Sequence, residues 1–187
     1  MPSLSEAERR TALQLARTAV VEAVAHRKLP DAVGLGGFLR ELRAVFVTLR
    51  VCNRLQGCIG VIEANEPLGE AIIRCAASAA LEDPRFAPMR PEQLDELRVE
   101  ISLLSPLEPI APESIEIGRH GLLVRLHAQR GLLLPQVAIE HRLNREQFLE
   151  ETCRKAGLSR EAWRDPQALL FGFTCEVFSE SSHHEGA

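Results

Sequence analysis

Residues 45–62 read VFVTLRVCNRLQGCIGVI, and this stretch predicts a β-hairpin. Its first half alternates apolar and other residues, with the apolar positions at Val45, Val47, Leu49 and Val51. Strict alternation is typical of a half-buried strand. The tripeptide Cys52-Asn53-Arg54 can turn the chain, and Leu55–Ile62 then returns as a second strand. The hexapeptide Leu-Gln-Gly-Cys-Ile-Gly at 55–60 is therefore expected on the second strand of the hairpin.

Two glycines of this hexapeptide, Gly57 and Gly60, bracket Cys58. Glycine lacks a Cβ atom and weakens a strand, so we expect the pair to leave room beside the thiol. A thiolate nucleophile needs access and a nearby cation. The cations available in the sequence are Arg54, Arg74 and Arg85. A structural role stays open, because free cysteine usually behaves as a small buried hydrophobe.

The segment Asp83-Pro84-Arg85-Phe86 follows a predicted helix and has two interpretations. In the first, Arg85 presents its guanidinium group to an anionic ligand and Asp83 orients it. In the second, the segment only ends the helix, with Phe86 in the core and Asp83 and Arg85 forming a surface ion pair. Turn chemistry alone favours neither interpretation.

The other predicted elements are mixed in type along the chain. Their approximate ranges are a helix from the Ser5–Glu8 capping box to Arg27, a helix from Pro67 to Leu81, a strand at 99–103, a second hairpin at 122–134, a helix at 145–156 and a closing strand at 170–178. Antiparallel hairpins with interspersed helices predict an α+β fold, a mostly antiparallel sheet with flanking helices.

The length of 187 residues suits a single domain at 1–187, with a core of about 13–178. The proline-spaced connector at Pro106, Pro109 and Pro112 is the expected boundary between two closely packed lobes. Residues 179–187 are expected to form a frayed polar tail, which contains His183 and His184.

Composition excludes several classes of function. The net charge of −4 offers no electrostatic footprint for nucleic acid or an anionic membrane. No stretch approaches the roughly 20 apolar residues of a membrane span. The five cysteines form no Cys-x-x-Cys pair and no export signal precedes them, which predicts reduced thiols in a cytoplasmic protein. The histidines lack metal-site spacing, so no metal site is expected.

Several motifs together resemble the AMMECR domain family, whose bacterial and archaeal members are called AmmeMemoRadiSam system protein A. Residues 55–60 resemble its Leu-Arg-Gly-Cys-Ile-Gly hallmark. The matching companions are Phe46-Val47-Thr48-Leu49, Asp83-Pro84-Arg85-Phe86, the strand at 99–106, the segment at 131–140, residues 148–158 and Trp163. The resemblance covers about Leu13–Phe178.

The resemblance implies an α+β fold of two closely packed lobes, with the Gly-Cys-Ile-Gly site near the cleft between them. It also implies association with a Memo-type protein, which looks like an extradiol dioxygenase, and with a radical-SAM enzyme. It specifies no reaction and no cofactor. Cys58 is the candidate nucleophile, and the candidate binding residues are Gln56, Gly57, Gly60, Asp83 and Arg85.

Gln56 departs from the hallmark, because the family has arginine at that position. A neutral amide replaces a charged bidentate donor there, so the protein should bind an anion less well or use Arg54 or Arg85 instead. Alternatively, the Gln56 side chain points to the other face of the strand and has a structural role. Three hypotheses remain open: an enzyme that uses Cys58 on a small or peptide substrate, a binding module for the two partners, and a purely structural junction.

Overall fold

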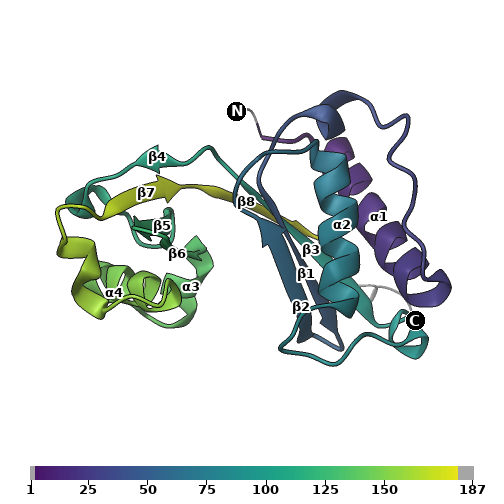
Figure 1. Cartoon of the computed structure of the whole chain (residues 1–187). Helices are drawn as coiled ribbons and strands as arrows, with labels where there is room; N and C mark the ends of the chain where they lie inside the picture. The colour runs from purple at the N-terminus through teal and green to yellow at the C-terminus, as the bar shows by residue number, and fades with distance from the viewer. Residues whose placement is uncertain (1–2, 181–187) are drawn as a thin grey trace. The chain divides into compact units, whose positions relative to one another are not determined.

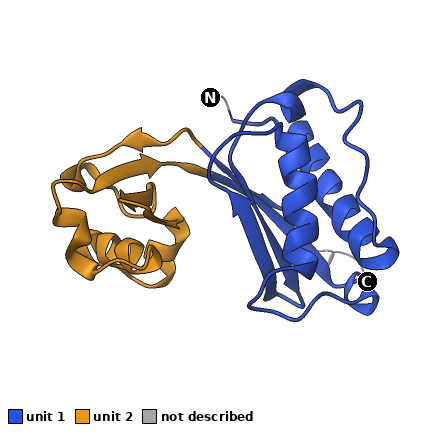
Figure 2. Ribbon diagram, in the orientation of Figure 1, with its two compact units in different colours: residues 1–104, 176–187 blue, residues 105–175 orange. Residues whose placement is uncertain are grey.

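The computed structural model describes residues 3–180, which divide into two compact units (Figure 2). Unit 1 takes in the described parts of Met1–Leu104 and Glu176–Ala187, and unit 2 is Ser105–Cys175. Each unit contains one four-stranded sheet. The paired strands are antiparallel and helices flank them, which confirms the predicted α+β class.

The sheet of unit 1 has the strand order β2-β1-β3-β8. Its hairpin consists of β1 (Val45–Val51) and β2 (Arg54–Val61), as the alternation predicts. The turn residues Cys52 and Asn53 have φ values of 50° and 62°. Two successive left-handed residues match the right-handed twist of the flanking strands, as in a type I′ turn. On its other side β1 pairs with β3 (Leu97–Leu104), which leaves β2 at the edge.

Two helices cover one face of this sheet and lie side by side (Figure 1). Helix α1 (Glu6–Val21) begins at the predicted Ser5–Glu8 capping box and continues into a π-helical turn, η1 (Glu22–His26). Helix α2 (Leu68–Leu81) begins one residue later than expected, because Pro67 is its N-cap. Its alanines are buried against the sheet, so the two layers approach closely. Among the described residues, no helix has the length and apolar character to cross a membrane.

Short helical turns complete unit 1. They are the 3₁₀ turns η2 (Gly37–Arg40) and η3 (Pro91–Gln93), which precede β1 and β3 respectively. Residues 83–90 connect α2 to η3 and run beside the outer edge of β2, where Asp83 contacts the backbone of Cys58. This connection positions the candidate site.

The prediction of a single closing strand at 170–178 is wrong, because the segment forms two strands in different sheets. Strand β7 (Leu169–Phe173) belongs to unit 2, and β8 (Cys175–Ser179) belongs to the sheet of unit 1. Thr174 separates them, and its carbonyl oxygen accepts a hydrogen bond from the backbone N–H of Ser105 at 2.9 Å. The apolar alternation continues through Thr174, so the sequence pattern contains no sign of the change of sheet.

The C-terminal strand is fastened to the first helix of the chain by ion pairs. The guanidinium group of Arg17 donates to both carboxylate oxygens of Glu180, each at 2.6 Å. Glu180 also accepts from the backbone N–H of Val99 at 2.9 Å. Ser179 and Glu180, predicted within a frayed tail, are therefore ordered. The rest of that prediction, residues 181–187 with His183 and His184, lies outside the described residues.

We predict that Glu180→Ala lowers the free energy of unfolding by about 1.5 kcal/mol, because the charge-assisted hydrogen bonds that Glu180 accepts from Arg17 and from β3 are lost. The matched control is Glu6→Ala, which removes an exposed i,i+4 pair with Arg10 and should cost less than about 0.5 kcal/mol. Urea unfolding followed by circular dichroism measures both. An equal loss of unfolding free energy in the two variants would show that the bonds of Glu180 with Arg17 and β3 do not stabilise unit 1.

The sheet of unit 2 has the strand order β4-β7-β5-β6. Strand β4 (Glu108–Pro109) lies within the proline-rich connector, and β5 (Gly121–Leu126) and β6 (Gln129–Leu133) form the second predicted hairpin. The 3₁₀ turn η4 (Pro112–Ser114) lies between β4 and β5. The helices α3 (Pro135–Glu140) and α4 (Arg145–Lys155) follow β6 and precede the 3₁₀ turn η5 (Arg160–Arg164).

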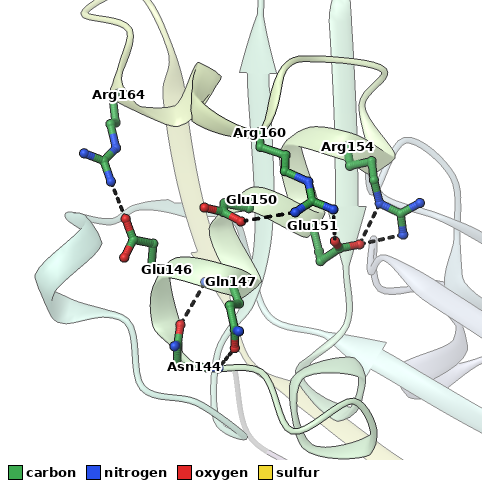
Figure 3. Close-up of polar contacts among 8 residues, drawn as sticks. All are labelled: Asn144, Glu146, Gln147, Glu150, Glu151, Arg154, Arg160 and Arg164. Atoms are coloured by element: carbon green, nitrogen blue, oxygen red, sulfur yellow. Dashed lines mark hydrogen bonds and ion pairs between the residues drawn. The ribbon is translucent and has the colours of Figure 1, made fainter.

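Ion pairs hold η5 against α4 on the surface of unit 2 (Figure 3). Arg164 pairs with Glu146, and Arg160 reaches Glu150 at 3.9 Å. Gly157 ends α4 with a φ of 73°, the left-handed C′ position predicted for it. The two arginines of η5 are thus paired with two glutamates of α4, so this part of the surface of unit 2 carries as many acidic as basic side chains.

Candidate functional site

The thiol of Cys58 lies on the face of the unit 1 sheet opposite to the helices. Val47 and Leu49 on β1 are fully buried on the helix-covered face, and Thr48 between them points the other way. Thr48 pairs with Cys58 across the hairpin, and its hydroxyl donates to the Cys58 Sγ at 3.3 Å. Thr48 is buried, whereas Cys58 is partly exposed.

A β-bulge at Gln56 decides which way the thiol points. Arg50 pairs with Leu55 but Leu49 pairs with Gly57, so Gln56 is an extra residue in β2. If Gln56 were paired and the register set by the turn continued, Cys58 would lie opposite Val47 and point toward the core, because a one-residue shift in register reverses every side chain. The bulge therefore turns the thiol out of the core.

The two glycines do not leave open space beside the thiol, contrary to the expectation from the sequence. A Cβ atom on Gly57 would lie 1.9 Å from the carbonyl oxygen of Ala79 in α2, so helix and strand meet there. A Cβ atom on Gly60 would lie 2.3 Å from the ring of Phe46 on β1. Both positions are filled by neighbouring groups, and glycine is needed for this close approach.

Asp83 and Arg85 bind the backbone of Cys58 at the outer edge of β2. The Cys58 N–H donates to Asp83 Oδ2 at 2.9 Å, and Arg85 Nη2 donates to the Cys58 carbonyl at 3.2 Å. These two groups supply the hydrogen bonds that a further strand would otherwise make. The pair therefore covers an edge that would be open to other chains, and fixes Cys58 in place.

The carboxylate of Asp83 is the centre of this arrangement. It accepts from Arg85 at three atoms, with distances of 2.7 Å from Nη2, 2.9 Å from Nε and 3.1 Å from the backbone N–H. The Asp83 side chain is 2% exposed and that of Arg85 is 54% exposed. Hydrogen bonds from the Arg85 side chain, then from the Cys58 and Arg85 backbones, hold the pKa of Asp83 well below its usual range.

Of the three arginines proposed to approach the thiol, the structure brings Arg85 to Cys58. The hydrogen bonds to Asp83 are the main cause of the raised pKa of Arg85, and the Cys58 side chain makes a smaller contribution in the same direction. Arg74 instead pairs with Glu66, and Arg54 lies exposed next to the hairpin turn. The second interpretation of residues 83–86 needs revision, because Asp83 is buried and Phe86 is only partly buried beneath the Arg85 guanidinium. In agreement with the first interpretation, Asp83 orients Arg85, and the binding of an anion by Arg85 stays a prediction.

Gln56 binds the connection at residues 83–90. Its side-chain amide donates to the carbonyl oxygen of Ala87 at 2.9 Å. This bond ties the bulge to the same connection that carries Asp83 and Arg85. The neutral amide at this position therefore has a structural contact, and the guanidinium at the site comes from Arg85.

The other cysteines lie in different surroundings. Burial raises the pKa of Cys75 to about 11 and also raises the pKa of Cys153. Cys52 is exposed in the hairpin turn, and Cys175 begins β8. The described residues contain no group of three or more His, Cys, Asp or Glu side chains that could hold a metal ion.

Sequence reasoning missed Thr48 and Phe46 as members of the site. The two-residue turn at 52–53 could have indicated the hairpin register, which would have placed Thr48 opposite Gly57. Only the bulge brings Thr48 opposite Cys58. The six predicted site residues all belong to unit 1, and their position at a cleft between the lobes stays a prediction.

Comparison with known proteins identifies the family. The family model described as AMMECR1 matches residues 13–178. The chain belongs to the AMMECR1 family. A protein from Methanothermobacter thermautotrophicus is 44% identical over 187 residues, which cover 95% of this chain and 96% of that protein. A protein from Thermococcus gammatolerans is 44% identical over 180 residues, covering 90% and 88%.

A crystal structure has the same AMMECR1-type fold. It is the structure of uncharacterized protein PH0010 from Pyrococcus horikoshii, with a TM-score of 0.85 and 40% sequence identity. The similarity covers 91% of this chain and 90% of that chain. The resemblance inferred from residues 55–60 and their companion motifs is thus confirmed at the level of family and fold.

Proposed function

We propose that this AMMECR1-family protein uses Cys58 as a reactive thiol toward a small or peptide substrate that carries a negative charge, with Arg85 binding the charge. The observation that carries the proposal is the position of the Arg85 guanidinium, which is bonded to the backbone of Cys58 and still 54% exposed. A guanidinium group beside a thiol can bind a carboxylate or phosphate and also favour the thiolate.

The geometry supports this function in two further ways. The bulge at Gln56 places the thiol outside the core, and a thiol that served only for packing would be expected to point inward. Asp83 holds Arg85 through its Nε and Nη2 atoms, so the cation is fixed before any ligand arrives. Preorganised charge binds more strongly than a mobile side chain, because less conformational entropy is lost.

Alkylation with a neutral and an anionic reagent tests the proposal. Cys58 is expected to react with iodoacetamide faster than Cys153, with rates measured by peptide mass spectrometry. Arg85→Gln should slow alkylation by iodoacetate several-fold more than alkylation by iodoacetamide, because only iodoacetate is attracted by the guanidinium. The control Arg119→Gln removes a similarly exposed arginine in unit 2 and should change neither rate.

Two results would overturn the proposal. The first is slower labelling of Cys58 than of Cys153, which would mean that the thiol is inaccessible. The second is an equal effect of Arg85→Gln on both reagents, which would mean that Arg85 attracts no anion at this site.

We further propose that the protein acts in the cytoplasm together with a Memo-type protein and a radical-SAM enzyme. Membership of the AMMECR1 family supports this proposal. Co-purification of the full chain with each partner, at micromolar concentration, is the test. Association is expected with at least one partner, and no association with either would reject the proposal.

A further inference from the structure

We infer that Thr48 is a positioning residue that holds the Cys58 thiol and stabilises its thiolate form. This inference rests on the proposed function, because it matters only if Cys58 reacts. Thr48 Oγ1 donates to Cys58 Sγ at 3.3 Å from the neighbouring strand. The two residues are a cross-strand pair, so the backbone ladder fixes their separation.

The burial of Thr48 adds to the argument. Thr48 is 8% exposed, so water competes little for its hydroxyl. A β-branched side chain has restricted χ1 freedom, and in a strand this keeps the hydroxyl in one direction. A hydrogen bond donated to the charged form of a group favours that form. Thr48 therefore contributes both orientation and charge stabilisation to the sulfur.

Several charged or titratable side chains lie around Cys58 and Thr48. Arg85 and Asp83 form an ion pair, and Arg85 Nη2 also donates to the Cys58 carbonyl. From β3, Glu100 pairs with Thr48 on its other side, and Arg50 lies two residues farther along β1. Cys75 of α2 contributes only at high pH, because its pKa is about 11. All of these side chains are retained in a variant that replaces Thr48.

The test is the pH profile of Cys58 alkylation by iodoacetamide in the full-length protein. In Thr48→Val the shape of the side chain is kept and the hydroxyl is lost. The profile should then move to higher pH, with alkylation near neutral pH slowed several-fold. Thr48→Ser restores a hydroxyl and should restore most of the rate. Thr48→Ala also lacks the hydroxyl and replaces Thr48→Val as the test if that variant does not fold.

A matched control separates this effect from a loss of packing. Thr152 is also buried, and its hydroxyl donates to the carbonyl oxygen of Phe148 within α4. Thr152→Val should therefore leave the Cys58 profile unchanged. A Thr48→Val profile equal to that of the wild type, with Cys58 still reactive, would overturn the inference alone. An unreactive Cys58 in the wild type would overturn the proposed function and the role of Thr48 with it.

Discussion

Gly57→Ala is expected to lower the free energy of unfolding by about 3 kcal/mol, at the upper end of overpacking effects. The added Cβ atom would lie 1.9 Å from the carbonyl oxygen of Ala79 and 2.8 Å from its carbonyl carbon. Both atoms belong to the backbone of α2, so no side-chain rotation can relieve the contact. Either the helix or the edge strand must move, and both pack against the core of unit 1.

The control for this prediction is Gly36→Ala. Gly36 has extended backbone angles, and a Cβ atom added to it would meet nothing within 4 Å. Alanine there should therefore change the free energy of unfolding by less than about 0.5 kcal/mol. Urea unfolding monitored by circular dichroism gives both values. A Gly57→Ala midpoint equal to that of Gly36→Ala would show that α2 and β2 are not in the close contact described.

Asp83→Asn is expected to cost about 2–3 kcal/mol. The amide keeps one acceptor oxygen where the carboxylate has two, and it loses the charge that orients Arg85. The cost stays below that of a fully buried pair, because the Arg85 side chain is 54% exposed and water can solvate it. Asp31→Asn is the control, since Asp31 lies exposed in a loop and, within residues 3–180, its side chain accepts from the Val33 N–H alone.

The same variant gives a pH dependence with a defined sign. The pKa of Asp83 is lower in the folded protein than in the unfolded chain, so its stabilisation is complete above the unfolded value of about 3.9. This contribution is lost as the pH falls through the folded value. The stability difference between wild type and Asp83→Asn should be constant from about pH 7 to 5 and should narrow below about pH 4. A difference that grows on acidification would contradict the assignment.

Local patterns in the sequence were enough to predict the hairpin, the capping box at Ser5 and the C-terminal glycine of α4. Each of these depends on residues within a few positions of one another. The bulge at Gln56 could not be predicted in this way, because it accompanies the approach of Ala79, which is more than 20 residues away in the sequence. The same is true of Asp83, whose buried carboxylate binds a backbone group 25 residues earlier.

The two strands at the end of the chain show a different limit. Strands β7 and β8 share one continuous apolar alternation, yet they belong to different sheets. Periodicity reports which side chains are buried and contains no information on the sheet that buries them. The family resemblance identified the family, because it compared many motifs spread over residues 13–178, but it did not predict this change of sheet.

The late position of β8 has a consequence for synthesis on the ribosome. Unit 2 is inserted between β3 and β8, so the sheet of unit 1 lacks its fourth strand until β8 (Cys175–Ser179) has emerged. A prematurely terminated chain would leave the edge of β3 uncovered and Arg17 without Glu180. An uncovered apolar edge promotes aggregation and recognition by chaperones or proteases. The sheet of unit 1 is therefore completed only after the whole of unit 2 has been synthesised.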